Sequence, residues 1–538
     1  MASEVREHVL RQAGGVPFYL VSYAQSLRAA RFAPAGEGIA PGTPAPWDLR
    51  QGVRQRAAAL SPEARTLLDA AAVAAGPTQR TVLVAVINLP EEAVYAALDE
   101  ACRARLLVED GDTYRFAHDV IGEVVEAGVG PARRAGLHRR LARALEALAP
   151  AGAPPVETLA YHYERAGEGA SAGMWFARAG DRARAIDAPA AAIAAYERAL
   201  ALLPGDGEHR AERLAALEGL GDALERQARY AEAIDAYAAL AEAAREAGDG
   251  AVEARAWLGM VWTHNMRGEY TQALASAQRA EEVARTAGAE LERARALYRQ
   301  SVVMGEQEQW GRAVALGEQA LEAATVLGAR TEMAESLDMI GLSLAVLGRA
   351  EEAERALARG LALAREGGDR RLIAFILRHL GFAATTEGGD RAMARARFEE
   401  ALTITREMGD RTRELPLLGF LGWELILQRE YAEAEAVLRQ AVWRGEEAGA
   451  DAPLAYARHH LAWALLRQGR DGEARDMALE VLVLARRIGQ PLLLGGGVGD
   501  PGSYGRAHGE SCADRGGPVR GRRVLRGEHT DVTGGGRG

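Results

Sequence analysis

Seven polar residues in the second half of the chain carry the groups with which a protein recognises a ligand. They are His264, Asn265, Arg378, His379, Glu424, His459 and His460. Imidazole, guanidinium, amide and carboxylate groups gathered on one surface can bind a peptide, a partner domain or a small ligand through hydrogen bonds and ion pairs. The alternative for each residue is that it is solvated or contributes only to packing.

No catalytic constellation stands out in the sequence. The chain contains no lysine, so all 65 of its basic residues are arginine. A phosphate-binding loop of the G-x-x-x-x-G-K-[ST] kind is therefore excluded, because its lysine supplies the charge that meets the β- and γ-phosphates. Lysine nucleophiles and Schiff bases are excluded for the same reason. We expect a protein that is not an enzyme and carries no cofactor.

Composition and charge narrow the class further. The 538 residues are rich in alanine, leucine, glutamate and arginine and only 6% aromatic, which indicates long helices. A net charge of -10 provides no basic field for nucleic acid or for anionic membranes. Cys102 and Cys512 offer no metal-ligand spacing and suit a reducing compartment. With no signal peptide or membrane-spanning run in view, we expect a cytoplasmic protein.

An internal repeat governs the middle of the chain. Glycines recur near the ends of helical stretches every 40 residues, with a single spacing of 41. They are Gly248, Gly288, Gly328, Gly368, Gly409, Gly449 and Gly489. A second landmark, often aromatic, stands three residues before an alanine in each unit, as Tyr230 does before Ala233. A fixed period of this length indicates a stacked array of helical repeats.

Each unit is expected to be a helix, a tight turn, a second helix and a glycine stop. Leu217, Leu220 and Leu224 fall at helical spacing, Gly221 lets the partner helix approach closely, and Gly248 supplies the left-handed residue that ends the second helix. The unit resembles the tetratricopeptide repeat in its long-helix variety. A HEAT or armadillo array has a similar period, but the recurring turn aromatic followed by x-x-Ala favours the tetratricopeptide repeat.

We therefore predict an all-α fold in which about eight long repeats form a right-handed superhelix over residues 174–490. Such repeats cannot bury their apolar faces alone, so they stack, and their first helices line a concave groove. We expect the groove to bind a protein or peptide partner, with a small-molecule inducer as a further option.

Residues 48–130 predict a small winged-helix domain. Ser61 followed by Pro62 and Glu63 is a helix start, and further helical segments follow. The alternating "LLVED", a turn at Asp110 and Gly111, and the returning "TYRFAHD" predict a β-hairpin. Residues 131–173 are expected to be connecting helices, in which His138 and His162 are structural.

The order of these segments is more specific than any one of them. "GGVPFYL", a proline-rich stretch, "LSPEARTLLDAAAV", the hairpin, "LAYHYERAG" and then helical repeats resemble the C-terminal portion of bacterial STAND (AAA-type) ATPase regulators, including MalT-like, LuxR-type and cyclase-linked members. The resemblance implies that residues 1–32 end an ATPase lid and that 33–47 are a linker. It also implies remnant nucleotide-pocket elements in Gly15, Pro17 and His118. Alternatively, Asp119 caps a helix and His118 packs against the hairpin.

The two ends depart from the family pattern. The P-loop, the acidic magnesium-binding strand and the arginine sensor that the family carries before the lid have no counterpart here, so a late start or a broken or split gene is one expectation. After Leu494 the helical period stops and residues 495–538 become rich in glycine and arginine. This composition predicts disorder, from a frameshift or from a natural basic tail.

The function that these features favour is a non-catalytic, signal-sensing and protein-interaction arm of a STAND-type ATPase or transcriptional regulator. The alternative is a DNA-binding regulator that acts through the winged helix. Its recognition segment at 90–105 carries Glu91, Glu92, Asp99 and Glu100 against Arg103 and Arg105, a charge unsuited to a DNA groove. Nucleic acid and membrane are accordingly not the expected partners.

Overall fold

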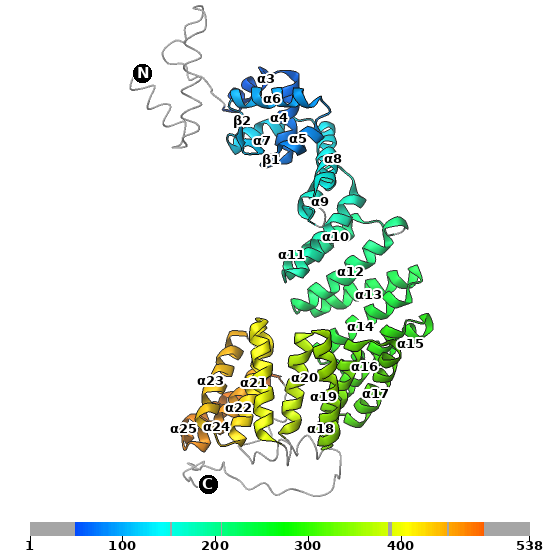
Figure 1. The fold of residues 1–538 in the computed structure, drawn as a ribbon, viewed down its shortest axis with the longest axis vertical. Coiled ribbons are helices and arrows are strands. Elements are labelled where there is room, and N and C mark those ends of the chain that lie inside the picture. Colours follow the sequence, from blue (N-terminus) through cyan, green and yellow to red (C-terminus); the bar gives the residue numbers. More distant parts are fainter. Residues whose placement is uncertain (1–48, 151–152, 206, 386–389, 449–450, 489–538) are drawn as a thin grey trace, which may run out of the picture. The chain divides into compact units, whose positions relative to one another are not determined.

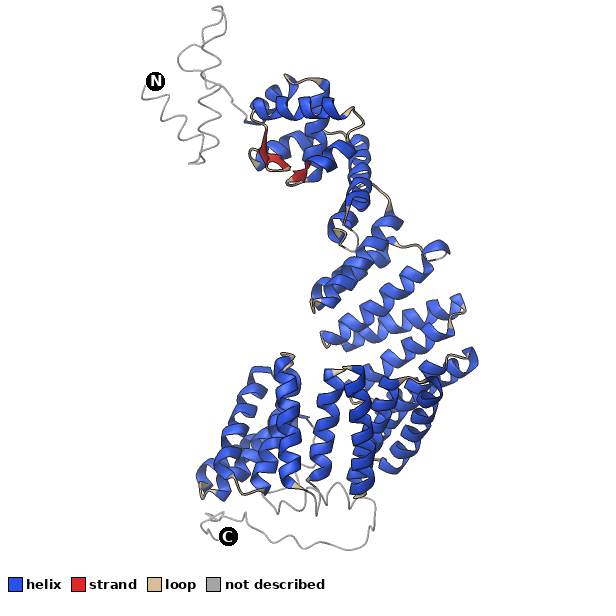
Figure 2. Ribbon diagram, viewed as in Figure 1, coloured by secondary structure: helices blue, strands red, loops and turns tan. Residues whose placement is uncertain are grey.

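The computed structural model describes residues 49–150, 153–205, 207–385, 390–448 and 451–488. The expectations for the lid end and linker, including Gly15 and Pro17, and for the tail from residue 495 lie outside these ranges, as do Gly449 and Gly489. The chain divides into two compact units at Thr263 and His264. Each unit is built almost wholly from helices (Figures 1 and 2).

The first unit begins with helices around a small sheet. The helices are α3 (Leu49–Ala58), α4 (Pro62–Ala74), α5 (Arg80–Val86), α6 (Glu91–Arg103), α7 (Asp119–Gly128) and α8 (Pro131–Leu148). The strands are β1 (Thr78–Gln79), β2 (Leu107–Asp110) and β3 (Thr113–Phe116), in the antiparallel order β1-β3-β2. The predicted hairpin is confirmed, with Gly111 at φ +62° in its turn. The assignment of this region as a winged helix stays a prediction.

Local sequence explains how these elements begin. The Ser61 hydroxyl accepts a hydrogen bond from the Ala64 amide at 3.1 Å, and Pro62 takes the first helical position of α4, as predicted. The Glu100 carboxylate of α6 accepts hydrogen bonds from both the Ser61 amide (2.9 Å) and its hydroxyl (2.6 Å), which fixes the start of α4 against α6. Leu137 of α8 is buried in the same core.

The repeats follow as helix pairs. In the first unit lie α9 (Val156–Arg165), α10 (Gly169–Ala185), α11 (Pro189–Leu202), α12 (Arg210–Arg226), α13 (Tyr230–Ala247) and most of α14 (Gly250–Met266). In the second lie α15 (Tyr270–Ala287), α16 (Glu290–Glu306), α17 (Trp310–Leu327), α18 (Arg330–Val346), α19 (Ala350–Gly367), α20 (Arg370–Ala384), α21 (Arg391–Glu407), α22 (Arg411–Leu427), α23 (Tyr431–Ala448), α24 (Asp451–Arg467) and α25 (Asp471–Ile488). From α10 onward the sequence order gives eight pairs. We call the even-numbered member of each pair its first helix and the odd-numbered member its second helix.

The predicted period is confirmed at both ends of the second helices. Gly248, Gly288, Gly328 and Gly368 each follow the end of a second helix in the left-handed conformation, with φ between +66° and +72°. The landmark residues that precede x-x-Ala, from Tyr230 onward, are the first residues of the second helices. Glycine tolerates positive φ at little cost, so these glycines mark where each of these repeats ends.

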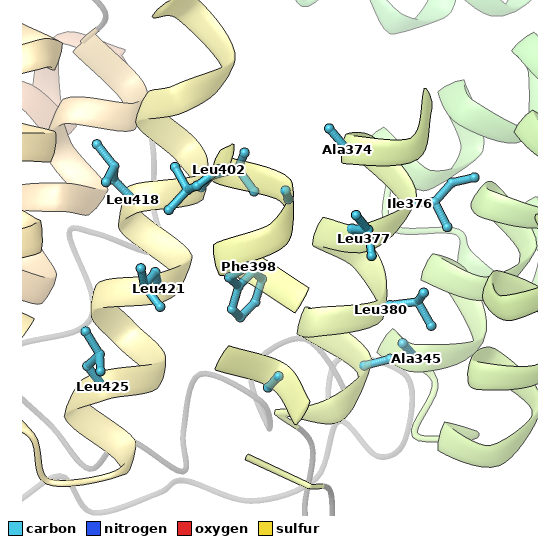
Figure 3. Packing of buried hydrophobic residues seen from close by; sticks show 14 of the residues in the cluster. Ala345, Ala374, Ile376, Leu377, Leu380, Phe398, Leu402, Leu418, Leu421 and Leu425 are labelled. Carbon is cyan, nitrogen blue, oxygen red and sulfur yellow. The ribbon is translucent and has the colours of Figure 1, made fainter. Parts of the chain in front are cut away.

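One recurring glycine inside the first helices has a different role, since Gly221, Gly341, Gly381 and Gly422 make room for a large side chain of a second helix. A Cβ on Gly221 would lie 2.5 Å from the Tyr237 ring, and one on Gly381 would lie 2.6 Å from the Phe398 ring. Positions 237 and 398 are equivalent in the repeat. In Figure 3, Phe398 lies between α20, which carries Leu377 and Leu380, and α22, which carries Leu421 and Leu425. The close approach predicted for Gly221 is therefore confirmed, and the same device recurs along the array.

In the second unit the first helices share one face. Three pairs of successive first helices pack against each other, α16 with α18, α18 with α20 and α22 with α24, whereas α20 and α22 are joined mainly through α21, which packs on both. Successive second helices have no comparable contacts within the described ranges. A stack that is closer on one side curves toward that side. We call the surface of α16, α18, α20, α22 and α24 the first-helix face, and it corresponds to the inner side that the sequence predicts.

Within the described ranges, none of the helices taken singly combines the length and the apolar character needed to cross a bilayer.

Candidate functional site

Arg378 and His379 of α20 form the centre of a polar cluster on the first-helix face. Nη2 of Arg378 lies 2.8 Å from Nε2 of His379, and Nδ1 of His379 lies 2.7 Å from Oδ1 of Asp338 on α18. Because arginine can only donate, Nε2 must accept, and Nδ1–H must donate to the carboxylate. His379 is therefore neutral, and burial lowers its pKa in agreement with this tautomer. The chain Asp338–His379–Arg378 fixes the guanidinium in one orientation.

Aromatic rings surround this guanidinium. Its central carbon lies 4.3 Å from the Phe375 ring centre and 5.9 Å from that of Phe420 on α22. Phe375 is 38% exposed although it is a large apolar side chain. Rings at these distances attract a cation and shield it from water. Burial accordingly lowers the pKa of Arg378, while Asp338 opposes that shift.

The cluster continues onto α24 through Trp423 of α22. The imidazole of His460 stacks on Trp423 with ring centres 4.9 Å apart and planes inclined by 30°, and His459 lies beside it at 5.8 Å. Burial lowers the pKa of His460 to about 3 and also lowers that of His459, so both rings are neutral near pH 7. We call the set Asp338, Phe375, Arg378, His379, Phe420, Trp423, His459 and His460 the first-helix row.

The repeat explains why these residues meet. Arg378 and His459 occupy equivalent positions two repeats apart, as do His379 and His460, and Asp338 is the equivalent of Arg378 one repeat earlier. Four of the seven predicted binding residues are thus brought onto one row. Asp338, Phe375, Phe420 and Trp423 were not predicted, although the 40-residue period of the sequence places them on the same helix face.

Glu424 lies under this surface rather than on it. Its side chain is 0% exposed, Gln428 Nε2 donates to its Oε1 at 3.1 Å, and Arg391 Nη1 stands 3.6 Å from its Oε2. Burial raises the pKa of Glu424. The Gln428 amide also donates to the Arg391 carbonyl, so these groups tie α22 to the start of α21. We assign Glu424 to packing.

His264 and Asn265 stand apart from the row, at the end of α14. His264 Nδ1 lies 2.7 Å from Oε2 of Glu269, the residue before α15. This contact closes the turn between the two helices. Asn265 Oδ1 is buried and has no hydrogen-bond partner among the described residues. The structure does not bring either residue to Arg378.

His118 has a local role at the start of α7. Its Nδ1 accepts a hydrogen bond from the Val120 amide at 3.3 Å, so His118 itself is the N-cap of α7 and Asp119 is the first helical residue. The expectation that Asp119 caps this helix is wrong, because the imidazole already meets the first-turn amide. The suggested role of His118 in a nucleotide pocket stays a prediction.

A hollow of about 360 Å³ lies on the opposite side of the second unit. Its walls come from α19, α20 and α21, and they include Leu361, Leu377 and Met393 beside Arg365 and Glu400. Arg365 and Glu400 form an ion pair at 2.6 Å. This hollow contains none of the predicted binding residues and is the competing location for a ligand.

A third cluster lies in the first unit, between α8 and α9. His138 and His162 are each 2% exposed, and their Nδ1 atoms stand 2.8 Å apart. One ring must donate and the other accept, so at least the accepting ring is neutral. Burial lowers the pKa of each to about 4. Among the described residues no group of three or more His, Cys, Asp and Glu is placed to hold a metal ion, and the structural role expected for this pair agrees with its burial.

Comparison with known proteins identifies the fold of this chain. No family model matches the sequence, and no curated protein matches it. A solved STAND protein with a tetratricopeptide-repeat sensor, from Pyrococcus horikoshii, aligns over 91% of this chain and 73% of its own, with a TM-score of 0.52 and 12% identity. The apo quorum sensor NprR from B. thuringiensis aligns over 73% of this chain and 99% of its own, with a TM-score of 0.46 and 16% identity. A Rap protein complexed with Competence and Sporulation Factor covers 65% and 97%, with a TM-score of 0.42 and 15% identity. The likeness to the first of these structures shows the fold alone, and it agrees with the predicted tetratricopeptide-repeat array.

Proposed function

We propose that this chain is a non-catalytic sensing arm that binds a peptide, or an extended segment of a partner protein, on the first-helix face of α18 to α24. The observation that carries the proposal is the first-helix row. In a chain that is 6% aromatic, three aromatic rings, an arginine and three histidines lie together across consecutive first helices. Surfaces of this composition provide both apolar contact and oriented hydrogen bonds for a peptide.

The proposal includes the setting of the arm. Its fold supports a place in a STAND-type regulator, and we propose a MalT-like, AAA-type regulator of transcription in the cytoplasm. The ATPase core would be supplied upstream or by a partner, because the chain has no lysine for a P-loop. A small-molecule inducer is the alternative occupant of the same face. Purified chain is expected to show no ATP hydrolysis.

The test compares two exposed apolar residues on opposite faces. Random linear peptides with free carboxyl termini are selected against the purified chain, and the selected peptides are titrated against Phe375→Glu and Met393→Glu. Phe375 (38% exposed) belongs to the first-helix row, while Met393 (45% exposed) lines the hollow on the second-helix side. Both substitutions place a charge at an exposed site, so neither should unfold the chain.

We expect Phe375→Glu to weaken binding by about tenfold or more, because the carboxylate removes apolar contact and would bind Arg378 in place of the peptide. Met393→Glu is expected to bind like the wild type. The reverse pattern would assign the ligand to the hollow and contradict the proposal, as would a failure to select any peptide.

A further inference from the structure

The guanidinium of Arg378 differs from other shielded cations of this chain in having no carboxylate partner among the described residues. Among the described residues it forms no ion pair, its one hydrogen bond is to neutral His379, and its Nε is buried without a partner. Other arginines of the second unit with little exposure are paired with carboxylates. Arg397 and Arg458, each with a side chain 16% exposed, contact Glu354 at 2.8 Å and Glu446 at 2.6 Å.

Shielding a cation from water costs free energy, and an ion pair with an anion would offset that cost. Arg378 is shielded by aromatic rings but has no such anion among the described residues. The cost is offset when an anion binds, and the planar guanidinium fork suits a carboxylate. His379 and Asp338 already hold the fork in place, so little side-chain entropy would be lost on binding. The cluster therefore has the geometry of a binding site for an anion that the described residues do not supply.

The neighbouring charges select the class of anion. Asp338 lies one hydrogen-bonded step behind Arg378, and it compensates part of the positive charge. Glu335, one helical turn earlier on α18, is a second acidic group near Asp338, and burial raises its pKa. Arg413 also faces Arg378, but it is already paired with Asp410. A dianion such as a phosphate would meet stronger repulsion from these acidic groups than a single carboxylate, so the neighbouring charges favour a carboxylate.

The rings beside Arg378 indicate which kind of ligand side chain would lie next to the carboxylate. Phe375 and Phe420 border the guanidinium, and Trp423 lies one helical turn beyond Phe420 on α22. These partly exposed rings offer contact to an aromatic or large apolar side chain.

Resting on the proposed function, we propose that Arg378 binds one carboxylate of the peptide ligand, and that Phe375, Phe420 and Trp423 hold an aromatic or large apolar side chain next to that carboxylate. His379 and Asp338 are positioning residues, since they act through Arg378. The carboxylate comes either from an Asp or Glu side chain or from the peptide terminus.

The experiment uses the peptides selected against the full chain. Each carboxylate of a selected peptide is replaced in turn by its amide, with Asp→Asn, Glu→Gln or a C-terminal amide, and fluorescence anisotropy gives Kd. The proteins are the wild type, Arg378→Met, Arg378→Lys and Arg371→Met. Arg371 is an exposed arginine on the same helix and serves as the matched control.

We expect one amide replacement to weaken wild-type binding by about 30-fold or more, the low end of the loss found when one partner of a buried charge pair is removed. The same replacement should have no further effect on Arg378→Met, which already binds weakly, while Arg371→Met should match the wild type. Arg378→Lys keeps the charge but loses the fork, so its affinity should fall between wild type and Arg378→Met. Which carboxylate responds distinguishes a side chain from the terminus.

The outcomes separate the two proposals. Peptides that bind the first-helix face equally well with every carboxylate amidated would overturn the assignment of Arg378 and leave the proposed function standing. An amide effect of equal size in Arg378→Met would do the same. If no peptide is selected, the proposed function fails and the carboxylate site fails with it.

Discussion

Replacing Phe398 by alanine is expected to lower the free energy of local unfolding around α20 to α22 by about 3–5 kcal/mol. Phe398 is 0% exposed, stacks on Phe420 with ring centres 5.8 Å apart, and fills the space above Gly381. Removing the ring leaves a cavity between two successive first helices. Because an array of repeats need not unfold in one step, hydrogen exchange of the α20 to α22 amides is the suitable measurement.

Two variants control this prediction. Phe398→Leu should cost less than half as much, because Leu357 and Leu438 occupy the equivalent position in neighbouring repeats and contact Gly341 and Gly422 in the same way. Met393→Ala changes an exposed side chain of the same helix and should alter stability by no more than about 0.5 kcal/mol. Equal effects for Phe398→Ala and Met393→Ala would contradict the packing described here.

Acid is expected to destabilise α8 and α9 between about pH 6.5 and pH 4. The pKa of His138 and that of His162 are each lowered to about 4, chiefly by burial and, for His138, also by Arg165 and Arg134. In the unfolded chain each imidazole titrates near 6.5. Below that pH the unfolded state binds protons that the folded state does not, so the free energy of unfolding falls as pH falls. The slope is up to about 1.4 kcal/mol per pH unit for each histidine, and no such loss occurs above pH 6.5.

The measurement is the exchange-derived opening free energy of the α8 and α9 amides at several pH values, corrected for the intrinsic exchange rate. The double variant His138→Leu, His162→Leu should have a flatter dependence on pH. Leu159→Met perturbs the same core without changing a titratable group, so it should shift the stability equally at every pH. An unchanged slope in the double variant would show that other groups govern the acid response.

Much of the fold was predictable because the residues that recur in each repeat have strict backbone preferences. Gly248, Gly288, Gly328 and Gly368, which follow the ends of second helices, adopt positive φ, and few other residues do so at low cost. Ser61 with Pro62 marked a helix start for an equally local reason. Such signals depend on one residue and its immediate neighbours, so they are visible in a single sequence.

The site was predictable only in part, because it depends on which side chains meet across repeats. The sequence placed Arg378 and His379 on a first helix, but the partner Asp338 is 40 residues away from Arg378 and is 3% exposed. Glu424 was assigned to the same surface, although it is fully buried against Arg391 and Gln428. The His118 cap could not be separated from an Asp119 cap, since both side chains can accept a hydrogen bond from a first-turn amide.

The central claim is that the first-helix face of the second unit binds a peptide. Its most direct test is hydrogen exchange of the full chain with and without a selected peptide at saturating concentration. We predict slower exchange in α18, α20, α22 and α24, with α19, α21 and α23 changing less and residues 49–148 unchanged. Protection concentrated in α19 and α21, around the hollow, or in residues 49–148 would contradict the account.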